Sequence, residues 1–457
     1  PRRDPVPADA AGVGAPARRQ HVVHPRNGIA STRFKQAVEL LTLLLRFVSP
    51  ADAEIGRYFH ARRKMGSTDR GFAAETVYGC LRRKRELEAL YEPVHKPDTD
   101  DERVRWLVAS WLLKYGGWSA RALTDAGFNG GAVALVERIR ALDLFEFPLA
   151  VRANLPDWMA HKLVAQFGAE QTLLLADALN QPAPVDLRVN LLKITRTALQ
   201  AQLREEGFEL APTPYSPLGL RRAQRAALFN TRAFSLGLYE VQDEGSQLVG
   251  LLAEARPGEK LVDFCAGAGG KTLQLAGQMG NTGVVQAFDV SRKRLDRFRS
   301  RLNRAGADNV QRRVLRDEHD PVLKALAGAA DAVLVDAPCS GTGTLRRNPD
   351  VKWKTLELAD LQRTQLSILD AASALVKPGG RLIYATCSLL AEENAAVTTA
   401  FLTAHPDFKP VQAGEILARQ GVAIPDAIAP DGALQLRPDR HGTDGFYALA
   451  MRRNAGA

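Results

Sequence analysis

Residues 261–272 read Leu-Val-Asp-Phe-Cys-Ala-Gly-Ala-Gly-Gly-Lys-Thr, and this stretch decides the fold. Its first four residues are typical of a buried strand, and a helix is predicted to begin near Leu273. Three glycines lie between the two elements. They let the backbone turn tightly and approach a ligand at the N-terminus of the helix. The stretch therefore predicts a strand, a ligand-binding loop and a helix in direct succession.

Two common nucleotide-binding patterns do not fit this loop. A Walker A loop needs a glycine five residues before its Gly-Lys-Thr, and Cys265 stands there. The dinucleotide pattern, started at Gly267, would need its third glycine where Thr272 stands. What remains is Asp263-x-x-x-Gly267-x-Gly269. This pattern resembles the loop by which class I methyltransferases hold S-adenosylmethionine.

Strand and helix alternate along the rest of the chain after residue 239. The short β-rich runs lie at residues 261–264, 284–289, 310–314, 332–336 and 381–385. Such alternation is typical of a parallel, doubly wound sheet, whose ligands bind beyond the carboxyl ends of the strands. A last strand around residues 445–451 is expected to return antiparallel. The fold class is therefore predicted to be α/β, with a Rossmann-like domain.

Two aspartates follow strands at this edge. Asp289 ends the second run, about twenty residues after the glycines, where an acid commonly hydrogen-bonds ribose hydroxyls. Asp317 follows the third run and either faces an adenine ring or caps a helix. Asp289 therefore strengthens the prediction of an adenosine-containing cofactor.

Three of the four cysteines also follow predicted strands: Cys265, Cys339 and Cys387. A free cysteine is more often a small buried hydrophobe, but three at one sheet edge indicate chemistry. Carbon 5 of cytosine becomes a nucleophile once a thiolate has added to carbon 6. The later loss of the carbon 5 proton needs a second acid–base group, for which Asp336 and Cys339 are candidates.

Composition sets the class of protein. The 457 residues are 46% hydrophobic and 25% charged, as in ordinary globular proteins, which argues against a fibrous or largely disordered chain. No apolar stretch is long enough to predict a membrane span. The formal net charge of +10 makes a polyanionic partner plausible. Four cysteines without CxxC spacing indicate a reducing cytoplasm, with neither a disulfide framework nor a metal site.

The chain is predicted to fold in pieces. Residues 1–30 are expected to form a flexible basic tail without a secretory signal, and residues 31–150 a helical domain. Residues 151–235 mix helical and strand-like stretches, which predicts a small α+β module. Residues 236–457 would form the catalytic α/β domain.

Four motifs together carry a family resemblance: residues 240–247 (Glu-Val-Gln-Asp-Glu-Gly-Ser-Gln), 263–272, 336–343 and 385–388. They resemble the RsmB-type branch of the Nol/Nop/Sun family of RNA 5-methylcytosine methyltransferases. The likeness extends to Arg188-Val189-Asn190, and the helical start, with residues 69–72 and 77–80, resembles the NusB-like RNA-binding domain of bacterial members.

The resemblance implies a role for each site residue. Cys387 would be the nucleophile, Cys339 would help to release the product, and Asp336 would hold and protonate the cytosine edge. The residues implied to bind S-adenosylmethionine are Cys265, Ala266, Gly267, Ala268, Gly269, Gly270, Lys271, Asp289, Asp317 and Asp336. The chain departs from many relatives at Gly267-Ala268, where they have Ala-Pro, and at Arg316, where they have glycine.

Three basic segments are candidate RNA contacts. The run at residues 82–85 favours a solvated helix face, and so does the arginine-rich helix predicted over 291–304, with Ser291 as its N-cap. Residues 346–354, just beyond Cys339, favour RNA contact, because they combine positive charge with Trp353, whose ring could stack on a flipped base.

The expected activity is methylation of cytosine carbon 5 in RNA, with ribosomal RNA of the small subunit as substrate and S-adenosylmethionine as cofactor. Two alternatives stay open on the residues alone. One is a non-catalytic NusB-like RNA-binding protein, and the other is a P-loop-like nucleotide-binding enzyme.

Overall fold

The computed structural model describes residues 27–223 and 227–455, which divide into two compact units. The first unit holds the residues up to Arg46 together with Arg57–Cys80 and Leu87–Leu142. The second holds Phe47–Gly56, Leu81–Glu86 and the chain from Asp143 onward. The predicted tail lies outside the described residues as far as residue 26, and residues 27–30 already belong to a helix.

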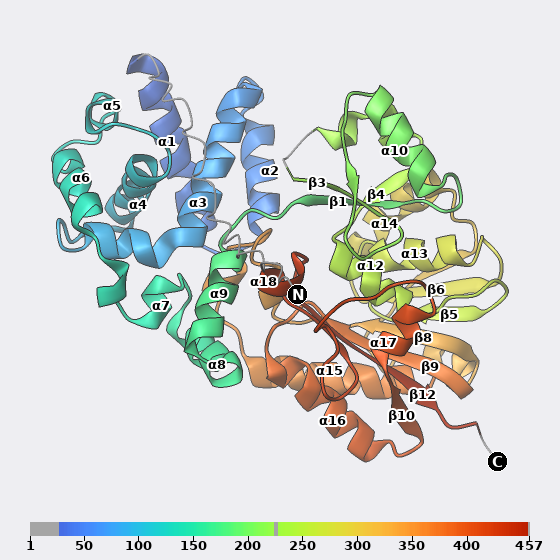
Figure 1. Cartoon of the computed structure of the whole chain (residues 1–457). Coiled ribbons are helices and arrows are strands. Elements are labelled where there is room, and N and C mark those ends of the chain that lie inside the picture. Colours follow the sequence, from blue (N-terminus) through green and yellow to red (C-terminus); the bar gives the residue numbers. More distant parts are fainter. Residues whose placement is uncertain (1–26, 224–226, 456–457) are drawn as a thin grey trace, which may run out of the picture. The chain divides into compact units, whose positions relative to one another are not determined.

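The first unit is built from helices alone (Figure 1). Its helices, two of which (α2 and α3) extend into the second unit, are α1 (Asn27–Leu44), α2 (Ala51–Ala61), α3 (Ser67–Tyr91), α4 (Asp100–Lys114), α5 (Ala120–Asp125) and α6 (Ala132–Ala141). Phe34, Val38 and Leu41 recur at helical spacing and are all buried, as their periodicity predicts. The backbone of α3 leaves helical geometry at Arg83.

The second unit begins with short helices and a four-stranded antiparallel sheet. The order of that sheet is β2-β3-β1-β4. Its elements are η1 (Leu144–Glu146), α7 (Leu149–Arg152), α8 (Asp157–Phe167), α9 (Ala169–Leu179), β1 (Val185–Val189), α10 (Arg196–Glu205), β2 (Ala211–Pro212), β3 (Gly219–Arg222), η2 (Leu228–Asn230), α11 (Arg232–Ser235) and β4 (Tyr239–Val241). We call β1–β4 the small sheet.

An eight-stranded sheet follows, which we call the large sheet. Along one path its order is β10-β12-β9-β8-β5-β6-β7, and β11 pairs with β12. The strands are β5 (Lys260–Asp263), β6 (Val284–Asp289), β7 (Val310–Val314), β8 (Ala330–Asp336), β9 (Val376–Thr386), β10 (Phe408–Val411), β11 (Leu434–Leu436) and β12 (Phe446–Arg453). Strands β5 to β9 pair in parallel, whereas β12 pairs antiparallel with both β9 and β10. The predicted Rossmann-like sheet and its antiparallel last strand are therefore confirmed.

Helices cover both faces of the large sheet (Figure 1). One face packs against α12 (Glu244–Leu251), α13 (Gly270–Gln278), α14 (Arg292–Ala305) and α17 (Ala413–Ala418), and the other against α15 (Leu358–Ser373) and α16 (Ala395–Ala404). Neighbouring strand residues face opposite ways, so Leu261 joins one core and Val262 the other. This explains why the strands read as continuous apolar runs.

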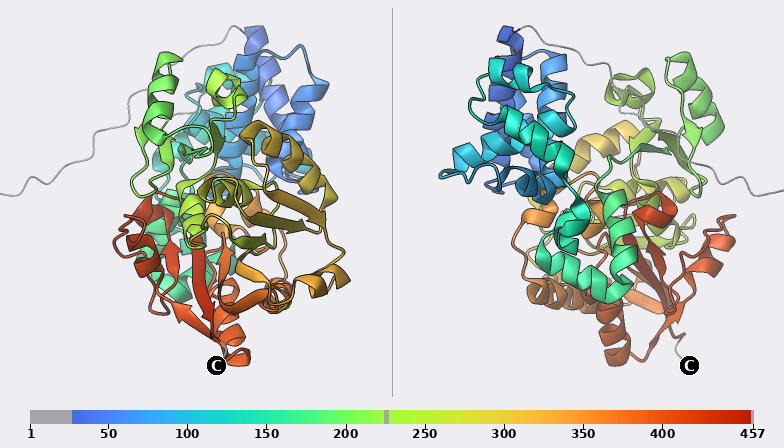
Figure 2. Two further views of the ribbon diagram at one scale, coloured as in Figure 1. Left: turned by 90° about the vertical axis from the view of Figure 1, so that its right-hand side faces the viewer. Right: turned by 60° about the vertical axis from the view of Figure 1, so that its left-hand side comes forward.

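The small sheet shares a core with the large sheet. One buried cluster contains Leu187 and Tyr239 of the small sheet, Leu248 of α12, and Ile383 and Phe446 of the large sheet. At another place in this unit, α9 contacts the short helix α18 (Pro438–His441), as Figure 2 shows in green and red. The small sheet is thus packed against the large sheet rather than linked loosely to it.

The remaining elements are short 3-10 helices in the second unit: η3 (Pro321–Leu326), η4 (Thr342–Thr344), η5 (Val351–Trp353) and η6 (Ala391–Glu393). Across the described ranges, every helix is too short or too polar to cross a membrane.

Candidate active site

The glycine loop joins β5 to α13 at the point where the strand order reverses between β5 and β8. Ligands of open α/β sheets bind at such a point. Gly267 and Gly269 both have positive φ, +56° and +83°. Gly269 also has no room for a side chain, because an added Cβ would lie 1.9 Å from the ring of Phe298. The loop therefore depends on glycine at this position.

Asp289 ties the glycine loop to the next strand. Its Oδ2 accepts a hydrogen bond from the amide of Gly267 at 2.9 Å, and its Oδ1 accepts one from the amide of Ser291 at 2.7 Å. The side chain is nearly buried, 6% exposed as a residue, and lies at the carboxyl end of β6. Asp289 thus sits against the loop that the sequence predicts to bind cofactor.

A cavity of about 530 Å³ opens at this edge. It is lined by all of the predicted site residues except Gly269: Cys265, Ala266, Gly267, Ala268, Gly270, Lys271, Asp289, Asp317, Asp336, Cys339 and Cys387. Gly269 lies behind the wall, against Phe298. Gln242 and Ser246, which belong to the motif at residues 240–247, also line the cavity. Other lining residues have no recognisable signal in the sequence, among them Val290, Leu315, Ile368 and Glu318.

Lys271 and Asp336 form an ion pair in the cavity, with Nζ 2.7 Å from Oδ2. Burial by itself would lower the pKa of Lys271, but the charge and hydrogen bond of Asp336 outweigh it, helped by Cys387 and Asp263, and the pKa is raised. The lysine is therefore a fixed cation in the cavity.

Cys339 and Cys387 lie side by side, with their Sγ atoms 3.5 Å apart. They come from the loops after β8 and β9, neighbouring parallel strands whose carboxyl ends meet at one edge. The hydrogen bond between the two thiols, then burial and the charges of Cys387 and Glu393, raise the pKa of Cys339 well above its ordinary range. Cys339 is thus held as a thiol, which can give a proton.

The third cysteine at this edge is not part of the pair. Cys265 lines the cavity, and burial, followed by the charges of Asp263, Asp336 and Asp289, raises its pKa well above the ordinary range. All four cysteines of the chain are free. In the part of the chain that the structure describes, His, Cys, Asp and Glu form no group that could hold a metal ion.

Comparisons with known proteins agree with this geometry. A family profile for the 16S rRNA methyltransferases RsmB/F matches residues 251–452, and one for the ferredoxin-like domain of RsmF/B-like methyltransferases matches residues 155–228. A probable ribosomal RNA small subunit methyltransferase B of Synechocystis is 30% identical over 449 residues, which are 91% of this chain and 99% of the relative. The chain belongs to the RsmB/F family. The resemblance predicted from the four motifs is therefore confirmed.

Other RsmB/F relatives extend this result. The ribosomal RNA small subunit methyltransferase B of Thermus thermophilus is 31% identical over 84% of this chain and 89% of its own length. Among solved structures, that of the protein PH0851 matches 93% of this chain and 99% of its own with a TM-score of 0.74 at 24% identity. The RsmB/F fold thus extends over nearly the whole chain.

The small sheet of this RsmB/F-family chain supports the glycine loop. Arg188 on β1 donates to the carbonyl of Gly270 at 2.6 Å and to the side chain of Gln242. Burial lowers the pKa of Arg188 to about 9, against the charge of Glu240. Asn190 donates to the carbonyls of Gly237 and Ala305, both at 2.8 Å. The Arg-Val-Asn motif therefore has a structural reason, since it joins the small sheet to the wall of the cavity.

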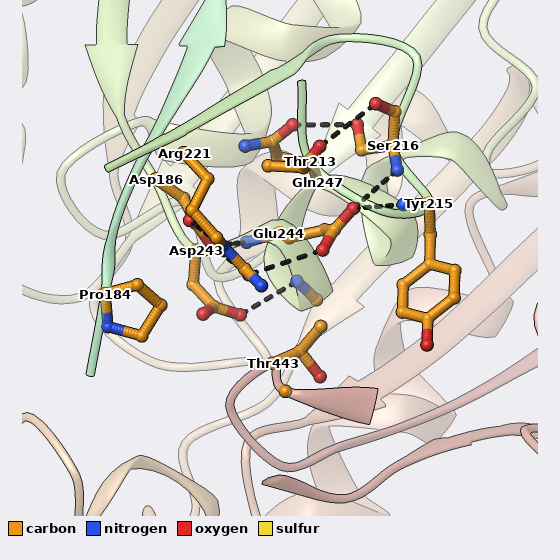
Figure 3. A network of polar contacts seen from close by, with 12 residues as sticks. Pro184, Asp186, Thr213, Tyr215, Ser216, Arg221, Asp243, Glu244, Gln247 and Thr443 are labelled. Atoms are coloured by element: carbon orange, nitrogen blue, oxygen red, sulfur yellow. Dashed lines mark hydrogen bonds and ion pairs between the residues drawn. The ribbon is translucent and has the colours of Figure 1, made fainter. Parts of the chain in front are cut away.

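A buried polar network makes a second connection (Figure 3). Arg221 of β3 forms a bidentate pair with Asp186 of β1, at 2.7 and 2.8 Å. Glu244, in the first turn of α12, accepts from the amides of Tyr215 and Ser216 and pairs with Arg221 at 3.3 Å. Because α12 also carries Ser246, which lines the cavity, the small sheet positions part of the site.

The RNA contact predicted for residues 346–354 of this chain is wrong for most of the segment. Arg346 is buried against Asp444, at 3.1 Å, and Arg347 pairs with Asp444 and Asp243, at 2.7 and 2.9 Å. Burial and the neighbouring charge of Asp444 raise the pKa of Asp243 to about 7 although Arg347 opposes them. These arginines neutralise buried carboxylates, so they do not face a nucleic acid.

Lys352 and Trp353 in the same segment also point inward. The ammonium of Lys352 donates to the carbonyls of Arg82 and Asn154 and to Oδ1 of Asn180, at 2.9, 2.7 and 2.9 Å. Burial, and then the charges of Arg83 and Arg82, lower the pKa of this lysine well below its ordinary range. The indole of Trp353 donates to the carbonyl of Leu81 at 2.8 Å. Trp353 is therefore a packing residue here.

The two other basic segments differ from each other. The solvated face predicted for residues 82–85 is wrong at Arg82, which is 7% exposed and donates to the carbonyl of Arg346. Helix α14 agrees with its prediction, since Leu295, Phe298 and Leu302 are buried. Its Ser291 cap does not form, because the Ser291 side chain makes no capping bond and Asp289 accepts from the Ser291 amide instead. Its exposed basic residues are Arg292, Lys293, Arg294, Arg297 and Arg299.

The helix cap predicted for Asp317 is wrong, because Asp320 caps η3, and Asp317 forms a turn instead. Its Oδ1 accepts from the amide of His319 at 2.9 Å, as a turn-forming aspartate does. It also lines the cavity, next to Glu318 and Leu315. Contact with an adenine ring stays a prediction.

The glycine loop gives a direct stability test. Gly269→Ala is expected to destabilise the protein by about 1–2 kcal/mol for the left-handed backbone and by about 1–3 kcal/mol more for the clash with Phe298. Gly267→Ala carries the backbone cost alone, because the nearest atom to its Cβ would be 4.0 Å away. Urea unfolding of both variants measures the difference. Equal loss of stability in the two variants would contradict the clash.

Proposed function

We propose that this protein methylates carbon 5 of a cytosine in 16S ribosomal RNA through a covalent adduct on Cys387. The observation that carries the proposal is the pair of thiols 3.5 Å apart in the wall of one cavity with the Lys271–Asp336 ion pair. Two cysteines are what this reaction uses, one to add to carbon 6 and one to help release the product. Methyl transfer to a nitrogen or oxygen would need neither.

The cavity fits S-adenosylmethionine. Five carboxylates line it, Asp263, Asp289, Asp317, Glu318 and Asp336, which suits a cofactor with a sulfonium and an ammonium group. Oδ1 of Asp263 is buried and has no hydrogen-bond partner in the structure, so it is available to a bound donor. The volume of the cavity lies within the range of about 300–1,000 Å³ for small-molecule sites. When bound, the cofactor supplies an electrophilic methyl group.

Cys387 and Asp336 have different roles in the proposed reaction. Cys387, with the Lys271 ammonium in the same cavity, adds its thiolate sulfur to carbon 6 and makes carbon 5 nucleophilic. Asp336 holds the exocyclic edge of the base and is itself held by Lys271. After methylation, a base must remove the carbon 5 proton so that the carbon–sulfur bond can break.

Cys339 suits this last step because its acidity depends on Cys387. The hydrogen bond between Cys339 and Cys387 is the first cause of its raised pKa. Once Cys387 is bonded to the base it is a thioether, which carries no charge and no proton. We therefore infer that adduct formation lowers the pKa of Cys339. Its thiol then loses its proton to water, and the resulting thiolate takes the carbon 5 proton as the carbon–sulfur bond to Cys387 breaks.

Asp289 tests the cofactor site. Asp289→Ala is expected to weaken S-adenosylmethionine binding by about 1–3 kcal/mol, since it removes a buried charged acceptor that also holds the amide of Gly267. Titration calorimetry measures the affinity. Asp296→Ala, on the exposed side of α14, is the matched control. Unchanged affinity in Asp289→Ala would remove this residue from the cofactor site.

The substrate is tested by bisulfite sequencing of 16S ribosomal RNA from cells with and without the gene, followed by methylation of the unmodified RNA with purified protein. Loss of one methylated cytosine, restored in vitro, supports the proposal. An unchanged pattern would contradict it. Action on ribosomal RNA places the protein in the cytoplasm, where its four free cysteines stay reduced.

A further inference from the structure

Beneath the two cysteines lies a buried carboxylate that none of the roles above uses. Glu393, at the end of η6, has no exposed surface. Its Oε1 accepts from the amide of Ser340 at 2.7 Å and from Nε2 of Gln365 at 3.0 Å. Its Oε2 accepts from the hydroxyl of Ser388 at 2.5 Å and from that of Ser340. One side chain thus takes four hydrogen bonds.

The two serines are the residues that directly follow the cysteines, Ser340 after Cys339 and Ser388 after Cys387. Glu393 therefore holds both cysteine loops at once. The loops also meet through their backbones, since the amide of Gly343 donates to the carbonyl of Cys387 at 2.9 Å. Asn394 supports the second loop, because its Nδ2 donates to the carbonyl of Ser388 at 3.0 Å.

We propose that Glu393 is a positioning residue, which keeps the thiols of Cys339 and Cys387 adjacent by holding the loops that carry them. The inference rests on the proposed function, because it matters only if both thiols act in one reaction. Two neighbouring strands of a sheet fix where their ends lie, but not how the loops beyond them turn. A burial this complete is costly for a carboxylate, and its four donors offset that cost.

Two variants separate the effect of the length of the Glu393 side chain, which we call its reach, from the effect of its charge. In Glu393→Gln the amide oxygen can accept from the Ser340 amide and Gln365, while the amide nitrogen donates to the hydroxyls of Ser340 and Ser388. Glu393→Asp keeps the charge but is one methylene shorter, so it cannot reach both loops. Glu392→Gln is the control, since Glu392 is partly exposed and pairs with Lys162 instead.

If Glu393 is a positioning residue, the reach of its side chain affects the methylation rate more than its charge does. In single-turnover methylation of 16S ribosomal RNA, Glu393→Asp is expected to lose about 10²-fold in rate, the effect of misplacing a reacting group by about 1 Å. Glu393→Gln is expected to stay within about tenfold of the wild type, because its hydrogen bonds are neutral and somewhat weaker. Glu392→Gln should match the wild type. Equal rates for Glu393→Asp and Glu393→Gln, or a slower Glu393→Gln, would overturn the proposal.

The pH profile gives a readout that a merely structural role would not move. The charge of Glu393 contributes, after the Cys387 hydrogen bond and burial, to the raised pKa of Cys339. Because Cys339 acts as the base of the second half of the reaction, its pKa sets the acidic limb of the product-release rate. Removing the charge in Glu393→Gln lowers that pKa and is expected to shift this limb to lower pH, whereas Glu393→Asp keeps the limb in place. An unshifted limb in Glu393→Gln would contradict the contact between this charge and the thiol pair.

A last measurement does not depend on methylation. Hydrogen peroxide oxidises two adjacent thiols to a disulfide, taking two protons and two electrons and becoming two molecules of water. Mass spectrometry of peptides then measures how fast Cys339 and Cys387 become bridged. The bridge is expected to form about tenfold more slowly in Glu393→Asp than in the wild type, because its thiols are no longer held together. Equal bridging rates would overturn the positioning role even if methylation is observed. If the RNA stays unmethylated while the bridge forms more slowly in Glu393→Asp than in the wild type, only the proposed function is refuted.

Discussion

Cys387→Ala is expected to yield neither methylated RNA nor a protein–RNA adduct, whereas Cys339→Ala is expected to methylate once and then remain bound to its RNA. The reason is the order of the two steps. Without the Cys387 sulfur the base is never activated, while without Cys339 the carbon 5 proton stays and the carbon–sulfur bond cannot break. Denaturing gel electrophoresis with labelled RNA and S-adenosylmethionine would show a slow-migrating band for Cys339→Ala only.

The control for this experiment is Cys80→Ala, because Cys80 is buried in the helical unit and contacts the carbonyl of Leu107 at 3.7 Å. It should behave like the wild type in both assays. A covalent band with Cys387→Ala, and none with Cys339→Ala, would exchange the two roles. The 3.5 Å between the sulfur atoms makes that exchange a real alternative, since either thiol is placed to reach the same base.

Asp336→Asn is expected to lower kcat by about 10²–10⁴-fold, the usual contribution of a positioned acid–base group. Unlike the carboxylate, the amide can neither take up a proton nor pass it to the base, and it leaves Lys271 without its charged partner at 2.7 Å. The S-adenosylmethionine affinity should change much less than the rate, because the other carboxylates of the cavity remain. Single-turnover kinetics at saturating cofactor separate the two effects. A variant that loses affinity but keeps its rate would make Asp336 a cofactor ligand only.

The same variant has a consequence for stability. The folded-state pKa of Lys271 is raised, so its pair with Asp336 stabilises the protein below the ordinary lysine pKa of about 10.4 and is lost as the pH rises further. Asp336→Asn should therefore unfold more easily than the wild type at neutral pH, by about 1–3 kcal/mol. The difference should shrink at strongly alkaline pH. Urea unfolding at pH 7 and pH 11 checks both statements.

Much of the catalytic half could be predicted from the sequence because its signals are local. The glycine loop, its strand and its helix are contiguous, and strand ends of a parallel sheet must share an edge. That rule brings the loops of Cys339 and Cys387 to the same edge, although the two residues lie 48 positions apart in the chain. Asp289 could be placed at this edge too, because it ends the next parallel strand about twenty residues after the glycines in the sequence.

The basic residues could not be placed, because their partners are distant in sequence. Arg347 looks like an RNA contact until Asp243 and Asp444, each about a hundred residues away, are found beside it. Lys352 looks exposed until three acceptors from residues 82, 154 and 180 surround it. Charge at a position says nothing about burial when a buried carboxylate or carbonyl elsewhere can pair with it. Glu393 is hidden in the same way, since its four donors come from three separate segments.

The place of β12 in the large sheet governs how the enzyme is made. This strand lies between β9 and β10, although it follows both in the chain. During synthesis, the edge of β9 next to the Cys387 loop therefore stays unpaired until residues 446–453 have left the ribosome. An unpaired β edge is a template for association with other chains. A ribosome that stops shortly before residue 446 thus releases a chain in which the glycine loop, Cys339 and Cys387 are translated, but whose sheet is open and prone to aggregate.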